Sequence, residues 1–140
     1  MSFNICIKKN PLSNWDASQG DRHLDFDLDG KDFDELQKFL NIKLHDTKQR
    51  EGESFDDNEE RLKNEYLKIA KEKGYEMLGR IWYWYESVSY SPFEINLLLE
   101  ECLKFKAQVQ NQNQLTAAEK LINACREAHK TNSGIFLASD

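Results

Sequence analysis

Long apolar runs are missing from this sequence of 140 residues. A membrane-spanning helix needs about 20 consecutive, mostly apolar residues, and no stretch of the chain has that composition. The N-terminal stretch MSFNICIKKN has lysines after a short apolar part and lacks the apolar core of a secretory signal. We therefore expect a cytoplasmic protein with no membrane partner.

Cysteine is scarce as well, because the chain has only Cys6, Cys102 and Cys125. An odd number without close spacing argues against a disulfide framework and is typical of free thiols in a reducing compartment. A zinc site of Cys102, Cys125 and His129 is one alternative, since the last two lie four residues apart on one helical face. Both cysteines, however, fall on apolar stripes, where a free thiol packs as a small hydrophobe. We predict no metal site.

Motifs of catalysis are also lacking. The histidines His23, His45 and His129 are scattered, so none stands in a recognisable frame with a cysteine and an orienting acid. The chain has no serine-hydrolase motif, no phosphate-binding glycine loop and no CxxC or HExxH spacing. Adjacent acids such as Glu100 and Glu101 usually face solvent. The sequence therefore predicts no catalytic residue and no cofactor, which favours a protein without enzymatic activity.

Positive charge is in deficit, and the net charge is −6. Between Asp21 and Glu35 seven acids face two bases, and between Glu51 and Glu60 six acids face none. One interpretation is that these acids lie on solvated loops and faces. The other is an acidic surface that steers a basic partner toward the protein. The same sign of charge disfavours direct binding to DNA or RNA.

Apolar and aromatic residues are, by contrast, well represented. Hydrophobic residues make up 39% of the chain, with three Trp, five Tyr and eight Phe, which argues against global disorder. A chain of this length can bury roughly 68% of the surface of its unfolded form. We predict a single globular domain over residues 1–140.

Three strands are predicted. Apolar and polar residues alternate in the N-terminal SFNICIKK and in HLDFDLD from Leu24 to Leu28, and the C-terminal GIFLASD is interpreted as a third strand. In the second of these the apolar side chains face one way and three aspartates face the other, namely Asp25, Asp27 and Asp29.

Two helices are expected in the first half of the chain. Asp32 should cap a helix that runs to about Leu40, with Glu35 completing a capping box. The polar and acidic stretch 43–58 then predicts a mobile loop. A second helix should run from about Asp57 to Lys73 and end at the glycine that follows.

Two more helices are expected in the second half. In Ser91–Glu94 the serine caps, the proline takes the first helical position and the glutamate closes the box. The polar run QVQNQNQ should end this helix, and Thr116 with Glu119 should begin the next one. Asn132 and Gly134 should end that helix.

The segment Tyr75–Tyr90, YEMLGRIWYWYESVSY, fits either a strand or a helix. Gly79 weakens the helix, and the density of aromatic residues favours a strand over part of it. The chain as a whole predicts an α+β fold. Its small antiparallel sheet would comprise the N-terminal, Leu24–Leu28, aromatic and C-terminal strands, packed against three to four helices.

The stretch DFDLDGKDFDEL, Asp25–Leu36, has the aspartate spacing of an EF-hand calcium loop. The last ligand position, however, is Leu36, and the acid falls one place early at Glu35. Phe26 and Leu28 are large apolar groups for a loop that wraps around an ion. A strand, a turn and a capped helix explain every residue, so we expect these elements in place of a calcium site.

Two groups of residues indicate a protein partner. The row of alternate aspartates in HLDFDLD, together with the stretch 51–60, offers a surface for a basic protein. Three aromatic side chains would act as anchors, because Trp and Tyr combine a large area with a polar group. The partner-binding residues predicted here are Asp25, Asp27, Asp29, Trp82, Trp84 and Tyr85.

The small, acidic α+β profile is similar to that of many bacterial proteins, including some immunity proteins that neutralise toxins. We therefore predict a non-catalytic protein-binding module, with an immunity-type inhibitor of a basic partner as its specific form. One alternative is a small-molecule binding protein or enzyme with a pocket lined by Trp82, Trp84 and Tyr85. A homodimer that buries the aromatic strand is another, and simple core packing of these aromatic residues is a third.

Overall fold

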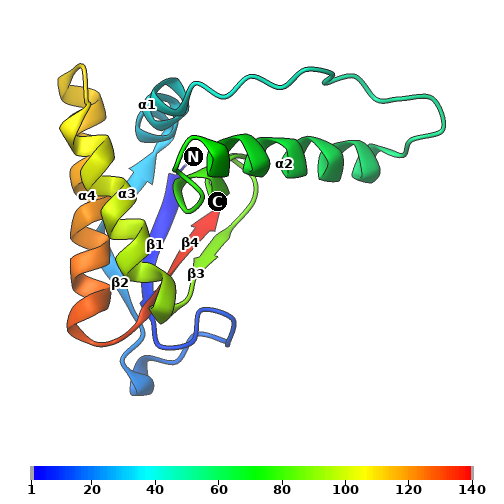
Figure 1. Ribbon diagram of the computed structural model, residues 1–140. Coiled ribbons are helices and arrows are strands. Elements are labelled where there is room, and N and C mark those ends of the chain that lie inside the picture. The colour runs from blue at the N-terminus through cyan, green and yellow to red at the C-terminus, as the bar shows by residue number, and fades with distance from the viewer. Residues whose placement is uncertain (1, 140) are drawn as a thin grey trace.

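The computed structural model describes residues 2–139, which contain one antiparallel sheet of four strands (Figure 1). The strands are β1 (Ser2–Lys8), β2 (Arg22–Asp29), β3 (Val88–Tyr90) and β4 (Gly134–Ser139), in the spatial order β2-β1-β4-β3. Every neighbouring pair is antiparallel. The predicted α+β class is confirmed, and so are its N-terminal, Leu24–Leu28 and C-terminal strands.

Period-two patterning sends alternate residues of the central strands to opposite faces. On β1 the side chains of Phe3, Ile5 and Ile7 are buried on one face, and Ile5 pairs across to Leu137 of β4. These residues belong to the main hydrophobic cluster of the molecule. The core therefore lies on this face of the sheet.

Four α-helices lie within the described residues: α1 (Gly30–Leu40), α2 (Phe55–Glu72), α3 (Ile95–Ala107) and α4 (Gln112–Lys130). The sheet is covered by α4, which contacts β1, β2 and β4, while α3 packs against α4 (Figure 1). Much of the buried side of α4 is alanine, which allows close approach to its neighbours, at Ala117, Ala118, Ala124 and Ala128.

The cap of α1 lies one turn earlier than the sequence suggested. Asp29 is the N-cap, and its carboxylate accepts from the backbone N–H of Asp32 at 2.9 Å. The carboxylate of Asp32 accepts in turn from the backbone N–H of Asp29 at 3.0 Å. The predicted cap at Asp32 with Glu35 is therefore wrong. The cause is that β2 runs straight into the helix, so Gly30 is already helical and no separate turn follows the strand.

The start of α4 also differs from the prediction. Asn111 caps the helix through the N–H of Gln114 at 2.8 Å, and Thr116 lies inside it, donating to the carbonyl of Gln112 at 3.0 Å. The last three residues of the polar run QVQNQNQ therefore belong to α4, and α3 ends just before the run, as predicted. The capping box Ser91–Glu94, in contrast, is confirmed, although its residues form a short 3₁₀ turn, η3 (Pro92–Glu94), ahead of α3.

The aromatic segment is a strand only at its end, in β3. Before it stand the 3₁₀ turn η2 (Leu78–Arg80) and a loop that carries Trp82–Tyr85. The buried carboxylate of Glu101, on α3, accepts from the backbone N–H groups of Met77 and Leu78 at 2.9–3.1 Å. Glu101 thus supplies the acceptors that these two N–H groups would otherwise find in a helix or a strand. At Gly79 any side chain would overlap the Cβ of Ala70.

Residues 41–61, which we call the arm, comprise a long loop and the first turns of α2 and project from the body of the protein (Figure 1). The loop ends earlier than expected, because Ser54 caps α2 through the N–H of Asp57 at 3.1 Å. Gly74, at φ +88°, follows the end of α2 as predicted. Whether the loop is mobile stays a prediction.

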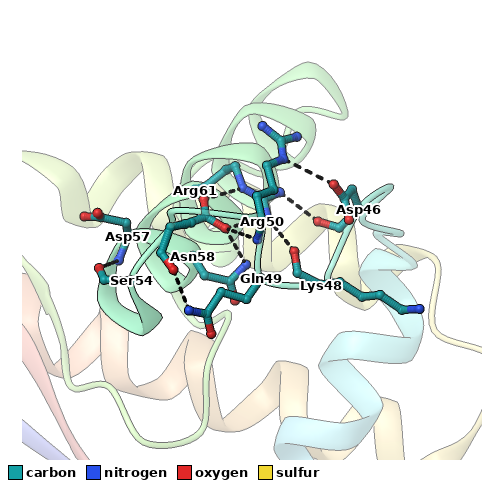
Figure 2. A network of polar contacts seen from close by, with 9 residues as sticks. Asp46, Lys48, Gln49, Arg50, Ser54, Asp57, Asn58 and Arg61 are labelled. Carbon is teal, nitrogen blue, oxygen red and sulfur yellow. Dashed lines mark hydrogen bonds and ion pairs between the residues drawn. The ribbon is translucent and has the colours of Figure 1, made fainter.

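Arg61 ties the loop to α2 (Figure 2). Its guanidinium donates to the carbonyls of Asp46 and Lys48 at 2.7 and 3.0 Å and forms a two-pronged contact with Glu53 at 2.9 and 3.2 Å. The hydrogen bond from Arg61 is the main reason that the pKa of Glu53 falls to about 2. The arm is thus held together by polar contacts.

No helix within residues 2–139 combines the length and the apolar character needed to cross a membrane.

Candidate functional site

The helices leave one face of the sheet uncovered. Registered pairs place His23, Cys6, Phe136 and Ser89 in one row across all four strands, and Asp27, Asn4 and Ala138 in the next row. These side chains point away from the core residues with which they alternate. We call this surface the open face. It comprises Asn4, Cys6, Lys8, His23, Asp25, Asp27, Ser89, Phe136 and Ala138.

A cavity of about 510 Å³ lies on the open face, and we call it the Trp15 hollow. Its floor is formed by strand residues that include Cys6 and Phe136, and its wall by the loop that links β1 to β2, with Pro11, Leu12 and Trp15. Volumes of this size are typical of ligand pockets.

The loop that forms the wall is fixed by buried polar contacts. The carboxylate of Asp21 is almost fully buried and accepts from the backbone N–H groups of Lys9 at 3.3 Å and Asp16 at 2.9 Å. Pro11 packs so closely on Gly134 that a Cβ there would lie 2.6 Å from the proline Cγ. The wall is therefore anchored to the sheet at both ends.

Trp15, His23 and Cys6 form a contact chain along one side of the hollow. The rings of Trp15 and His23 stack with centroids 4.4 Å apart and planes inclined by 16°. The Cys6 sulfur lies 3.1 Å from Nδ1 of His23. Burial raises the pKa of the Cys6 thiol, so at neutral pH it carries its proton. This pair is not arranged as an activated nucleophile.

Lys8 lies on the other side of the hollow. Only 5% of its surface is exposed, and its ammonium donates to the carbonyl of Ser13. The same nitrogen stands 5.7 Å from the centre of the Phe136 ring.

Two strongly exposed hydrophobic side chains flank the wall. Leu12 is 87% exposed and Phe93 is 91% exposed, and both line a second hollow of about 330 Å³. Pro11, Leu12 and Ser89 line both hollows, so the two adjoin.

Asp25 and Asp27 lie at the opposite end of the open face, on the edge strand β2. The register of β1 and β2 shifts between Asn4 and Cys6, so that Ile5 alone faces three residues of β2. This bulge leaves a third hollow, of about 400 Å³, which shares His23 with the first. Neither side-chain carboxylate has a hydrogen bond or an ion pair with any residue in 2–139.

The structure brings together only part of the predicted site. Asp25 and Asp27 share the open face, but Asp29 caps α1, and the N–H of Asp32 lowers its pKa. The other acidic stretch, 51–60, lies on the arm, which projects on the side of β3 (Figure 1). The expected common acidic patch of the β2 aspartates and this stretch is therefore not formed.

The predicted aromatic anchors lie away from the hollow. Trp84 packs against the core, with its ring 5.1 Å from Phe3 and 5.0 Å from Phe33. The Trp82 indole donates to Glu86 at 3.0 Å. Tyr85 is 63% exposed. For Trp84 the core-packing alternative was therefore the right one.

Sequence reasoning missed the aromatic residues that do line the hollow. Trp15 stands in the polar stretch NPLSNWDASQGD between the first two predicted strands, where no site residue was predicted. Phe136 was assigned to a strand but not to a face. The alternation of β1 already placed Cys6 and Lys8 together opposite the core. A tryptophan a few residues after this strand was the one signal in the sequence that a loop could cover these two residues.

No group of three metal-ligating side chains occurs among the described residues. Cys102 and Cys125 are buried within the core, whereas His129 is exposed on α4. The three aspartates with calcium-loop spacing, Asp25, Asp27 and Asp29, lie on β2, which continues directly into α1 in place of a calcium loop.

Comparison of the chain with protein-family models, with curated proteins and with solved structures finds no match.

Proposed function

We propose that this protein is a non-catalytic binding module that docks a basic protein partner on its open face. The observation that carries the proposal is an uncovered sheet face with two unpaired aspartates and three adjoining hollows, next to exposed hydrophobic side chains. Hydrophobic side chains exposed next to a hollow are characteristic of interaction sites.

The size of the surface supports a macromolecular partner. Four strands about 4.8 Å apart span roughly 14 Å, and the hollows extend across them from Asp27 to Phe93. An extended segment or a loop of a protein fits this length. Trp15, Leu12 and Phe93 would contribute the apolar contacts, since large side chains near the centre of an interface dominate binding energy.

The charge of the surface supports a basic partner. Asp25 and Asp27 have no cation or donor among residues 2–139, so their charge is available to a partner. Complementary charge raises association rates and fixes orientation, and it weakens as salt screens it.

Two matched variants test the proposal. Asp25→Asn with Asp27→Asn removes two charges from the open face, and Glu59→Gln with Glu60→Gln removes two from the arm. We expect a basic protein captured by the wild-type chain to be lost from the first variant, retained by the second, and released as salt rises. Equal capture by both variants would overturn the proposal.

The apolar part of the surface is tested separately. Leu12→Ser with Phe93→Ser should leave folding unaffected, because both side chains are exposed. The double variant should release the same partner faster, as measured by surface plasmon resonance. Leu97→Ser with Leu103→Ser, on the exposed side of α3, is the control. A partner that responds only to the α3 variant would place the interface elsewhere.

An immunity-type inhibitor is the specific case in which the basic partner is a toxin. A toxin-like reading frame beside the gene, whose product is neutralised by the wild-type chain and not by the Asp25, Asp27 variant, is the expected finding. A sedimentation coefficient that rises with concentration would support the homodimer instead.

A further inference from the structure

Lys8 is a buried cation without a counter-ion. Among the lysines of residues 2–139 it alone is buried, and it forms no ion pair there. The more exposed Lys120, in contrast, binds the carboxylate of Asp32 at 2.6 Å. Burying a charge is costly unless it is paired. The missing partner is therefore an observation that needs an explanation.

The hydrogen bonds of Lys8 are also incomplete. An ammonium has three N–H donors, and this one has a single acceptor, the carbonyl of Ser13. The carboxylate of Asp21, on the same loop, accepts the backbone N–H groups of Lys9 and Asp16 and forms no ion pair with Lys8. The side chain lines the Trp15 hollow, where there is room for an acceptor.

A second donor lines the same hollow. The Cys6 thiol carries its proton and lies 3.1 Å from Nδ1 of His23, and on that basis we assign the ring proton to Nε2. The hollow thus presents an ammonium and an imidazole N–H between apolar walls formed by Trp15, Leu12 and Phe136.

We infer that the Trp15 hollow binds a carboxylate carried on an apolar body. Lys8 pairs with the carboxylate, His23 donates a second hydrogen bond, and the body packs between Trp15 and Phe136. A single carboxylate matches the single positive charge of Lys8. Hydrogen bonds between charged groups are also stronger than those between neutral groups. The carboxylate comes either from a free apolar acid or from the C-terminal residue of a protein chain.

This site shares the open face with the proposed docking surface but does not depend on it. It takes a negative group at Lys8, whereas the partner is recognised through positive groups at Asp25 and Asp27. Binding of small probes to the chain alone therefore tests the inference without any protein partner.

The probes are two acid and amide pairs. One pair is 3-phenylpropionate and its amide, and the other is a tripeptide ending in phenylalanine with a free or amidated C-terminus. Titration of the full chain, followed by the backbone amide signals of Cys6, Ser89 and Phe136, should show binding of an acid and at least tenfold weaker binding of its amide. This comparison uses the wild-type chain and so does not depend on a variant that folds.

Lys8→Met keeps the length of the side chain and removes its charge. We expect the acid to bind this variant at least tenfold more weakly and the amide to be unaffected, whereas Lys68→Met, an exposed control with the same change in net charge, should bind as wild type. Preference for the free acid or for the free peptide terminus identifies the source of the carboxylate. Equal binding of acid and amide, unchanged binding by Lys8→Met, or no binding of either acid at millimolar concentration would overturn the inference.

Discussion

The two faces of the sheet differ: one is covered by helices, and the other is the open face. On β1 the residues Ile5 and Ile7 are buried beneath α4, while Cys6 and Lys8, which alternate with them, line a hollow on the other face. The covered face is filled by hydrophobic side chains of α3 and α4. The open face has only a loop over one end. Substitutions on the two faces of β1 should therefore separate effects on stability from effects on the binding that we propose.

The largest effect should follow from emptying the covered face. Leu137→Ala removes a fully buried side chain and should lower the free energy of unfolding by about 2–5 kcal/mol. Its neighbour Phe136 is partly exposed on the open face, so Phe136→Ala should cost clearly less. Urea denaturation of both variants measures the difference. Equal losses would show that the two faces are not energetically distinct.

A somewhat smaller effect is expected at Glu101, which holds the turn at Met77 and Leu78. Glu101→Ala leaves these two N–H groups without their acceptor and should cost about 2–4 kcal/mol. Glu101→Gln keeps one oxygen and should cost less.

The same residue should give a pH dependence with a defined sign. Burial raises the pKa of Glu101 above its usual value, so the folded state holds the proton more tightly than the unfolded state. Its contribution is complete below the ordinary pKa of about 4.3 and is lost as pH rises through the raised value. Denaturation curves of Glu101→Gln should lack this component, and an unchanged profile would contradict the assignment.

Acid should loosen the arm while the sheet stays intact. The pKa of Glu53 is lowered to about 2, so its contact with Arg61 is complete at neutral pH and is lost as pH falls from about 4.5 toward 2. Amide exchange within residues 41–54 should accelerate over that range. Arg61→Met at neutral pH should reproduce the change, while exchange in β1 and β4 stays slow.

The smallest effect on stability is expected on the open face itself. Asp25→Asn with Asp27→Asn should change the free energy of unfolding by less than about 0.5 kcal/mol, because neither side chain has a partner within residues 2–139. A large loss in thermal denaturation would mean that these residues serve the fold and not a partner.

Local pattern was enough to predict the elements that depend on local chemistry. The alternation of β1 and β2, the Ser91–Glu94 box and the Gly74 stop were all readable from the sequence. The Tyr75–Tyr90 segment was not, because Glu101, distant in the chain, decides its backbone conformation. The cap of α1 was misplaced because continuity of β2 with the helix makes Asp29 the cap.

The site was less predictable than the fold. Asp25 and Asp27 were identified through their charge, since period-two spacing places them on one face. Trp15 and Lys8 were not, because their proximity depends on how the loop between β1 and β2 folds back over the sheet. The buried Asp21 and the Pro11–Gly134 contact determine that path, and neither is a local pattern.

The bulge between β1 and β2 has a consequence for self-association. The strand β2 is an edge of the sheet, and an edge offers unpaired backbone groups on which further chains can add. Here the register shift breaks the regular ladder, and a second copy paired antiparallel to β2 would bring aspartates near aspartates. Asp25 and Asp27, for which we propose a basic partner, would therefore also disfavour the addition of a second copy at this edge.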